Sequence, residues 1–250
     1  MVETTRRKPF KISRTPRREI RPESNKLIFL SCEGNVKEEE YFGRVTEIYD
    51  EVKSKIQFIS IKEEILVKKE RDRTEEEIRE LGKSKPWQLL EKIEKYKEEK
   101  KDIFDFDKHP DDEFWIVSDV DENTTPENLE KWKETLNKCR EKGYGYAISN
   151  PFFEIWLLLH HSEITDEDKK YGVTNEQSYE PTDHFKERLA ALGVPLVKKK
   201  RKHIVKEDYD REKIKVAIER GKKITVLEEG VPKGLGTSVY KLLEKIEGLK

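Results

Sequence analysis

Two short acidic motifs each follow an apolar run, and they contain the residues best suited to chemistry. In the first motif, Glu33 and Gly34 follow the apolar run 27–32. In the second, Asp119 and Asp121 follow the run 114–118. Each run has the length of a buried strand, and the C-terminal ends of parallel strands meet at one edge of a sheet. We therefore expect the three carboxylates to converge at that edge.

Three converging carboxylates repel one another unless a cation lies between them. Oxygen ligands are those that Mg²⁺ and Mn²⁺ prefer in proteins. The pattern therefore predicts a metal site formed by Glu33, Asp119 and Asp121, with Mg²⁺ or Mn²⁺ as the cofactor. Each motif alone is a weak signal, because acidic residues are also common in loops and at helix caps. Their joint placement favours a metal-dependent enzyme that acts on phosphates.

A further candidate is Glu154, a single charge inside the apolar segment 152–159. Burying an unpaired carboxylate is costly, so it needs a cation, a hydrogen-bond donor or a raised pKa. Two explanations stay open: a salt bridge to a Lys or Arg of the C-terminal half, or a catalytic carboxylate that faces the metal site. His160 lies about 120° further around the same helix, so we expect a helix-end histidine without a shared contact.

Two basic segments could contact nucleic acid. The tail 1–26 holds nine Lys or Arg residues against three Glu, and we expect it to be disordered. A second basic run follows Pro195 and predicts a loop: Lys198, Lys199, Lys200, Arg201 and Lys202. Lys and Arg neutralise phosphates without reading sequence. Each segment is therefore explained either as a nucleic-acid contact or as a solvated charge run.

Hydrophobic periodicity predicts the elements that position these residues. Strands are expected at 27–32, 56–61, 114–118 and 144–149, with helical patterns after each of them. This alternation predicts an α/β fold with an open, mainly parallel four-stranded sheet flanked by helices. After residue 163 the strand signal fades, and apolar stripes at 185–192, 214–218 and 239–246 predict a mostly α-helical C-terminal half. The segment 234–238 is expected to begin the last helix, capped by Thr237 or Ser238.

These elements predict three parts: a basic tail (1–26), an α/β catalytic core (27–162) and a helical region packed on that core (163–250). Apolar residues make up 34% of the chain and charged residues 42%, which predicts a thin core. The formal net charge is −1, so any nucleic-acid affinity must come from local patches. No apolar run reaches the length of a membrane span, and we expect a cytoplasmic protein without membrane contact.

Several of these segments together resemble the RloB family, which also includes the AbiLii-type abortive-infection proteins. The resemblance covers roughly residues 26–245, and its most specific piece is Asn-Pro-Phe-Phe-Glu-Ile-Trp at 150–156. The other matching pieces are 32–34, 40–42, 115–121 and 236–240. In that family the first strand is often followed by Glu-Gly-x-x-Thr-Glu, whereas this chain has Lys37 in place of the hydroxyl residue. The departure weakens a helix-capping role there and leaves the acidic residues intact.

The resemblance implies a Toprim-like fold, related to the metal-binding domain of topoisomerases, primases and OLD-type nucleases. It implies that Glu33 is the Toprim glutamate and that Asp119 and Asp121 are the Asp-x-Asp pair. We therefore expect a metal-dependent nuclease in a phage-defence or restriction-linked system, with an ATPase as a candidate partner protein. Glu154 would bind a second metal ion or orient the ligands of the first.

The alternative is a catalytically silent sensor or assembly module that binds a nucleotide or a protein partner through the same pocket. The near-neutral net charge and the lack of aromatic residues among the basic ones favour this alternative. Binding of a divalent metal ion distinguishes the two. The sequence leaves open DNA versus RNA, strand preference, oligomeric state, trigger and the role of His160.

Overall fold

The computed structural model describes residues 26–34, 36–49, 56–61, 85–120, 126–173, 183–198 and 202–248. The predictions made for the tail 1–25, for Asp121 and for the basic residues 199–201 fall outside these ranges. The structure therefore tests the sheet, most of the helices and part of the predicted metal site.

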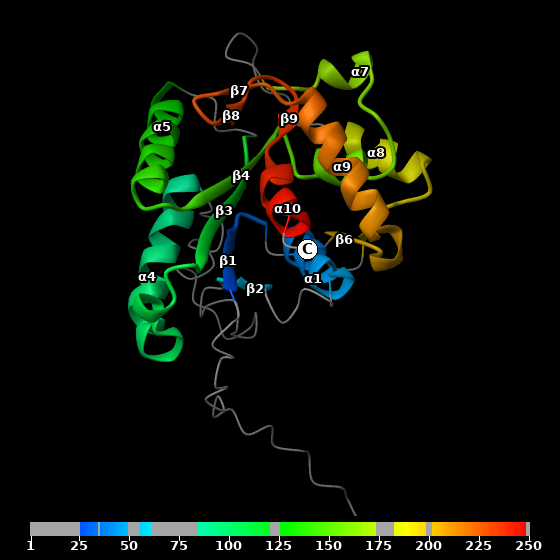
Figure 1. Ribbon diagram of the computed structural model, residues 1–250. Coiled ribbons are helices and arrows are strands. Elements are labelled where there is room, and N and C mark those ends of the chain that lie inside the picture. The colour runs from blue at the N-terminus through cyan, green and yellow to red at the C-terminus, as the bar shows by residue number, and fades with distance from the viewer. Residues whose placement is uncertain are drawn as a thin grey trace, which may run out of the picture.

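Four parallel strands form the centre of the fold (Figure 1). They are β1 (Lys26–Cys32), β2 (Ile56–Ser60), β3 (Glu113–Asp119) and β4 (Gly145–Asn150), in the order β2-β1-β3-β4. These are the four predicted strands, and the predicted α/β sheet is confirmed. A fifth, two-residue strand, β9 (Gly236–Thr237), runs antiparallel to β4. The last helix, α10 (Val239–Glu247), begins directly after this strand with Ser238 as its N-cap residue, so the helix start predicted for 234–238 is confirmed. The sequence did not show that Gly236 and Thr237 extend the sheet before the helix begins.

Helices cover both faces of the sheet. One face carries α4 (Pro86–Phe104) and α5 (Pro126–Glu141). The other carries α1 (Lys37–Ile48), α6 (Glu154–Leu159) and α10 (Val239–Glu247), as Figure 1 shows for α1 and α10. Each face has its own apolar core, and the central residues of β1 and β3 are buried throughout. Such unbroken burial is expected of a parallel sheet that is covered on both sides.

The C-terminal half is mostly helical, as the apolar stripes predict. Its main helices are α8 (His184–Ala191), α9 (Arg211–Ile224) and α10, with the short α7 (Asp166–Lys169) before them. α9 packs on both α6 and α10, so this half encloses the segment that contains Glu154.

Short strands also occur in this half. The basic run begins and ends in β5 (Val197–Lys198) and β6 (Lys202–His203), which pair antiparallel. The prediction of a loop was therefore wrong at Lys198 and Lys202, which lie in a hairpin. A second pair is formed by β7 (Leu227–Glu228) and β8 (Val231–Pro232). Short 3₁₀ helices lie at Phe106–Lys108 and Lys206–Asp208.

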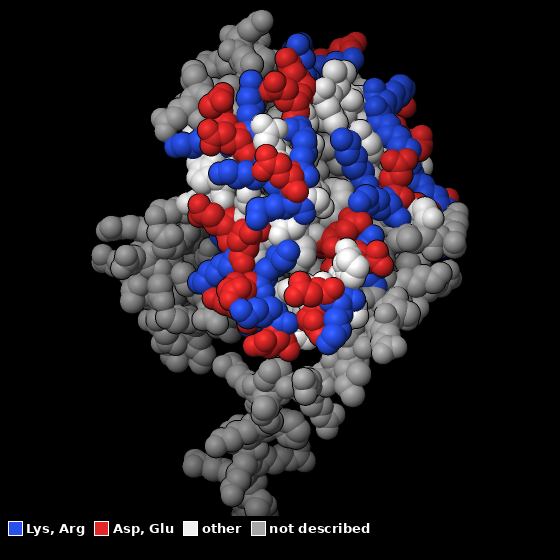
Figure 2. All heavy atoms as spheres, turned by 60° about the vertical axis from the view of Figure 1, so that its left-hand side comes forward, with Lys and Arg blue, Asp and Glu red and all other residues white. Residues whose placement is uncertain are grey.

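Opposite charges are mixed on the surface. On the face shown in Figure 2, Lys and Arg side chains lie among Asp and Glu across the described residues. This mixing agrees with the near-zero net charge of the chain and gives this face no extended field of one sign. Within the described ranges, no helix has both the length and the apolar character needed to cross a bilayer.

Candidate carboxylate site

Glu33 and Asp119 meet at the C-terminal edge of the sheet. β1 and β3 are direct neighbours, and the Glu33 amide continues their pairing by donating to the Val117 carbonyl oxygen at 2.9 Å. Glu33 Oε2 accepts hydrogen bonds from Ser118 Oγ at 2.6 Å and from the Asp119 amide at 2.9 Å. The two carboxylates predicted to share a site are thus brought together by adjacent strands, whereas Asp121 lies outside the described residues.

A second glutamate from α1 packs against the turn that follows Glu33. Glu38 lies in the first turn of α1 and is 4% exposed. A Cβ atom added to Gly34 would lie 1.9 Å from Glu38 Oε2, so the absence of a side chain at Gly34 makes room for this carboxylate. Glu38 Oε2 is buried and has no hydrogen-bond partner among the described residues. Glu38 was not predicted as a site residue, although its place one helical turn beyond the Glu33-Gly34 motif is a signal that the sequence offers.

Glu154 enters the same cluster from α6. This helix follows the end of β4, and Glu154 is its first residue, with 2% of its side chain exposed. Its Oε1 lies 2.7 Å from Lys37 Nζ, while its Oε2 is buried and has no hydrogen-bond partner within the described ranges. A salt bridge was one of the two predicted explanations for Glu154. The predicted location of the basic partner was wrong, because this lysine lies at the start of α1 and not in the C-terminal half.

The charges of these groups shift one another's pKa values. Burial raises the pKa of Asp119 well above its ordinary value, and the carboxylates of Glu33, Glu38 and Glu154 add to this effect. Burial likewise raises the pKa of Glu38, against the opposing influence of Lys37. Both shifts show that negative charge is poorly compensated at this edge of the sheet.

Lys37 supplies the positive charge that the described residues place among these carboxylates. Burial alone lowers the pKa of a lysine, but Glu154, Glu38 and Asp119 outweigh it and raise the pKa of Lys37 above its ordinary value. The ammonium group therefore stays charged at neutral pH. This one cation is stabilised by the carboxylates of Glu154, Glu38 and Asp119, while Glu33 adjoins Asp119.

The chemistry of these residues fits a hard divalent cation. Their donors are carboxylate oxygens, and two of these buried oxygens have no hydrogen-bond partner in the part of the chain that the structure describes, which is unusual for buried polar atoms. Among the residues that the structure describes, no three His, Cys, Asp or Glu side chains are already arranged as a metal centre. The described residues therefore provide the charge and the donor type for a cation, without a complete ligand shell.

His160 has a separate, structural environment at the end of α6. Its Nδ1 lies 2.8 Å from the Trp156 carbonyl oxygen, and its Nε2 lies 3.0 Å from the Tyr41 hydroxyl. Burial lowers the pKa of His160 to about 3, so the ring is neutral at physiological pH. These contacts are those of a helix-end histidine whose polar atoms are both satisfied.

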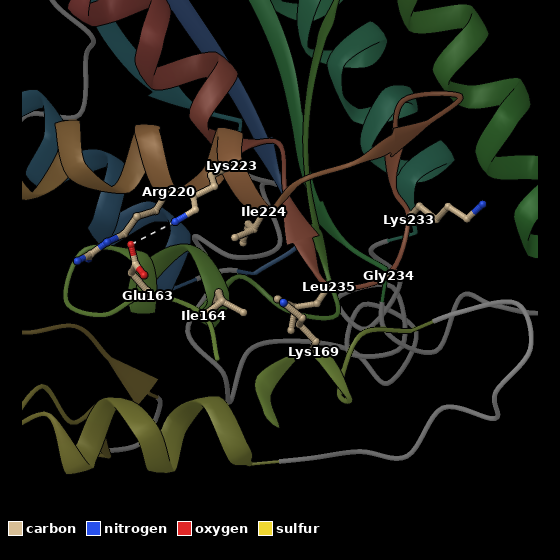
Figure 3. Close-up of a pocket in the computed structure, with 9 residues that line it drawn as sticks. All are labelled: Glu163, Ile164, Lys169, Arg220, Lys223, Ile224, Lys233, Gly234 and Leu235. Carbon is tan, nitrogen blue, oxygen red and sulfur yellow. Dashed lines mark ion pairs between the residues drawn. The ribbon is translucent and has the colours of Figure 1, made fainter. Parts of the chain in front are cut away.

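A hollow of about 580 Å³ lies between α7, α9 and the loop that leads into β9 (Figure 3). Its lining residues are Glu163, Ile164, Lys169, Arg220, Lys223, Ile224, Lys233, Gly234 and Leu235. Three of its cations pair with carboxylates: Lys169 with Asp166, Lys223 with Glu163 and Lys233 with Glu228. In Figure 3, Lys233 also points away from the other lining side chains. The hollow is therefore basic in composition but largely neutralised, and it shares no residue with the carboxylate cluster.

The comparisons with known proteins place the chain in a family. The sequence model of the RloB family, described as RloB-like protein, matches residues 28–246. This span contains the strands β1, β3 and β4 almost completely and every described residue of the carboxylate cluster. No curated protein and no solved structure matches the chain. Because the match covers most of the sequence, the chain belongs to the RloB-like protein family.

Proposed function

We propose that this protein is a Toprim-like, divalent-metal-dependent nuclease that acts in a phage-defence or restriction-linked system. The observation that supports the proposal best is the meeting of Glu33 and Asp119 on adjacent strands, with the buried carboxylates of Glu38 and Glu154 beside them. This is a concentration of negative charge at the sheet edge where parallel α/β folds place their sites.

Glu33 and the two aspartates have distinct roles in the proposal. Asp119, with Asp121 as predicted from the sequence, would hold Mg²⁺ or Mn²⁺. A bound divalent cation of this kind polarises a phosphoryl oxygen and lowers the pKa of a coordinated water molecule. Glu33 is held in one orientation by Ser118 and by the Asp119 amide, which suits a metal ligand or a general base.

The test of this proposal is cleavage by the purified full-length chain. Single- and double-stranded DNA and RNA are incubated with Mg²⁺ or Mn²⁺, and the products are resolved by electrophoresis. Cleavage should require the metal ion and should be lost in Asp119→Ala. The matched control is Asp102→Ala, which removes an exposed carboxylate of α4 and should cleave like the native protein. Metal-dependent cleavage that persists in Asp119→Ala would contradict the proposed site.

The basic hairpin is proposed to bind the nucleic-acid backbone. If Lys199, Lys200 and Arg201 all contact phosphates, replacing them with Ala should reduce the slope of log affinity against log salt by up to about three units. Turnover at saturating substrate should change little. The control is the same charge change on α4, with Lys95, Lys100 and Lys101 replaced by Ala. An unaltered salt slope in this variant would identify the run as a solvated loop.

A silent sensor or assembly module is the second candidate function. It is favoured by the Lys37–Glu154 ion pair, which already neutralises one carboxylate, and by the lack of a preassembled metal centre among the described residues. Metal titration separates the candidates, since a nuclease of this type must bind a divalent ion at Asp119. The family resemblance also makes an ATPase a candidate partner in either case.

A further inference from the structure

Lys37 lies inside the carboxylate site although it begins a surface helix. Its ammonium nitrogen is 2.7 Å from Glu154 Oε1, and 20% of its side chain is exposed. A lysine that has lost most of its water needs nearby negative charge to remain ionised. Here that charge comes from three segments of the chain, since Glu154, Glu38 and Asp119 all stabilise the ammonium.

The ammonium of Lys37 occupies the side of the cluster that Glu154 offers. It lies 2.7 Å from Glu154 Oε1, so a divalent ion bound to that oxygen would lie beside the ammonium. Like charges at short distance in a buried site repel strongly. Without the lysine, Glu154 Oε1 would be left to a second cation.

Two buried oxygens of the cluster are available as ligands. Glu38 Oε2 and Glu154 Oε2 lie in side chains that are 4% and 2% exposed, and neither has a hydrogen-bond partner among the residues that the structure describes. Glu154 therefore gives one oxygen to Lys37, and its other oxygen is not used by any described donor. The ammonium thus satisfies only part of the cluster.

We propose that the Lys37 ammonium occupies the place of a second divalent metal ion and thereby limits this site to one divalent ion. The inference rests on the proposed function, because it assumes that the carboxylates bind a divalent ion. It makes Lys37 a residue that sets the number of metal ions.

Counting bound Mn²⁺ tests the inference without reference to activity. Equilibrium dialysis of the full chain, with free Mn²⁺ measured by electron paramagnetic resonance, should give one ion per native chain. Lys37→Thr should bind a second ion, and Lys37→Met should do the same with a side chain of similar length. Lys37→Arg keeps the charge and should bind one. The control Lys95→Thr, on the exposed surface of α4, should also bind one.

Thermal unfolding provides a second readout on the same proteins. Removal of the ammonium leaves Glu154 buried and unpaired, so Lys37→Thr and Lys37→Met should melt below the native protein in chelator. Saturating Mn²⁺ should then raise their melting temperatures by more than it raises that of the native protein, because two ions bind only to the folded state.

The outcomes separate the inference from the proposed function. Two ions in the native protein, or one ion with unchanged affinity in both uncharged variants, would overturn the role of Lys37 while the metal site and the nuclease proposal stand. If the native protein binds no Mn²⁺, the metal-dependent function fails and the inference fails with it. One ion in the native protein and two in the uncharged variants would support both.

Discussion

At the scale of single residues, the space beside Gly34 is filled by the Glu38 side chain. The Glu38 carboxylate lies where a side chain at Gly34 would be, so an added Cβ atom would overlap it. Glu38 is buried, so its carboxylate has little room to move away. Gly34→Ala should therefore destabilise the fold by about 1–3 kcal/mol, as overpacking does elsewhere. Chemical denaturation measures this change.

Gly43 provides the matched control for this substitution. It lies in α1, and an added Cβ atom there meets nothing within 4 Å. Gly43→Ala should stabilise the protein by roughly 0.5–1 kcal/mol, because alanine favours a helix more than glycine does. If both variants change stability in the same direction and by the same amount, Gly34 is not constrained by Glu38.

Asp119 makes the stability of the metal-free protein depend on pH. Burial and neighbouring carboxylates raise its pKa in the folded state above the ordinary value of 3.8, so the folded state binds this proton more tightly than the unfolded state does. Stability therefore falls as pH rises from about 3.8 through the folded pKa. Asp119→Asn has no carboxylate to ionise at this position, so it avoids this loss of stability and should be more stable than the native protein at neutral pH.

Unfolding in chelator across the pH range checks this expectation. The advantage of Asp119→Asn should shrink as the solution is acidified toward about pH 4, and each unit of raised pKa contributes about 1.4 kcal/mol. Asp166→Asn is the control with the opposite sign, because hydrogen bonding to Lys169 lowers the pKa of Asp166. A constant difference between Asp119→Asn and the native protein at every pH would refute the raised pKa.

At the scale of secondary-structure elements, Asp168 joins α7 to α8. Its side chain is fully buried and accepts hydrogen bonds from the Thr165 amide at 2.7 Å, from His184 Nε2 at 2.7 Å and from the guanidinium of Arg188. Asp168→Asn removes the charge that these donors face. Removal of one partner from a buried ion pair costs about 3–5 kcal/mol.

Asp166, on the same helix, provides the control, because its side chain lies on the surface. Its side chain is 97% exposed in its pair with Lys169, so Asp166→Asn should leave stability nearly unchanged. Thermal or chemical unfolding of the two variants gives the comparison. Equal effects would mean that the link between α7 and α8 does not depend on Asp168.

At the scale of the whole molecule, a bound metal ion should stabilise the fold. The carboxylate cluster joins residues of β1, α1, β3 and α6, and the unfolded chain does not hold them together. A ligand that binds only the folded state at 100 times its Kd adds about 2.7 kcal/mol. Mn²⁺ should therefore raise the Tm of the native protein, and Asp119→Asn and Asp121→Asn should abolish the rise. A full shift in both variants would place the metal elsewhere.

The sequence by itself determined the strands, most of the helices and the meeting of Glu33 with Asp119. Apolar runs marked β1 and β3, and the rule that parallel strands end at one edge brought their acidic ends together. These features follow from local pattern, because burial of a strand on both faces requires a continuous apolar run.

Only the tertiary structure determined where Glu38 packs, which residue pairs with Glu154 and which strand pairs with β9. The sequence indicated that Glu154 needs a partner but did not identify Lys37 as that partner. The chain contains many lysines, and only the fold determines which of them lies next to Glu154. β9 has two residues, too few to show a periodicity, and it exists because β4 offers it an edge. Contacts between residues far apart in the chain depend on how the helices and strands pack against one another. The local order of apolar and polar residues does not determine that packing.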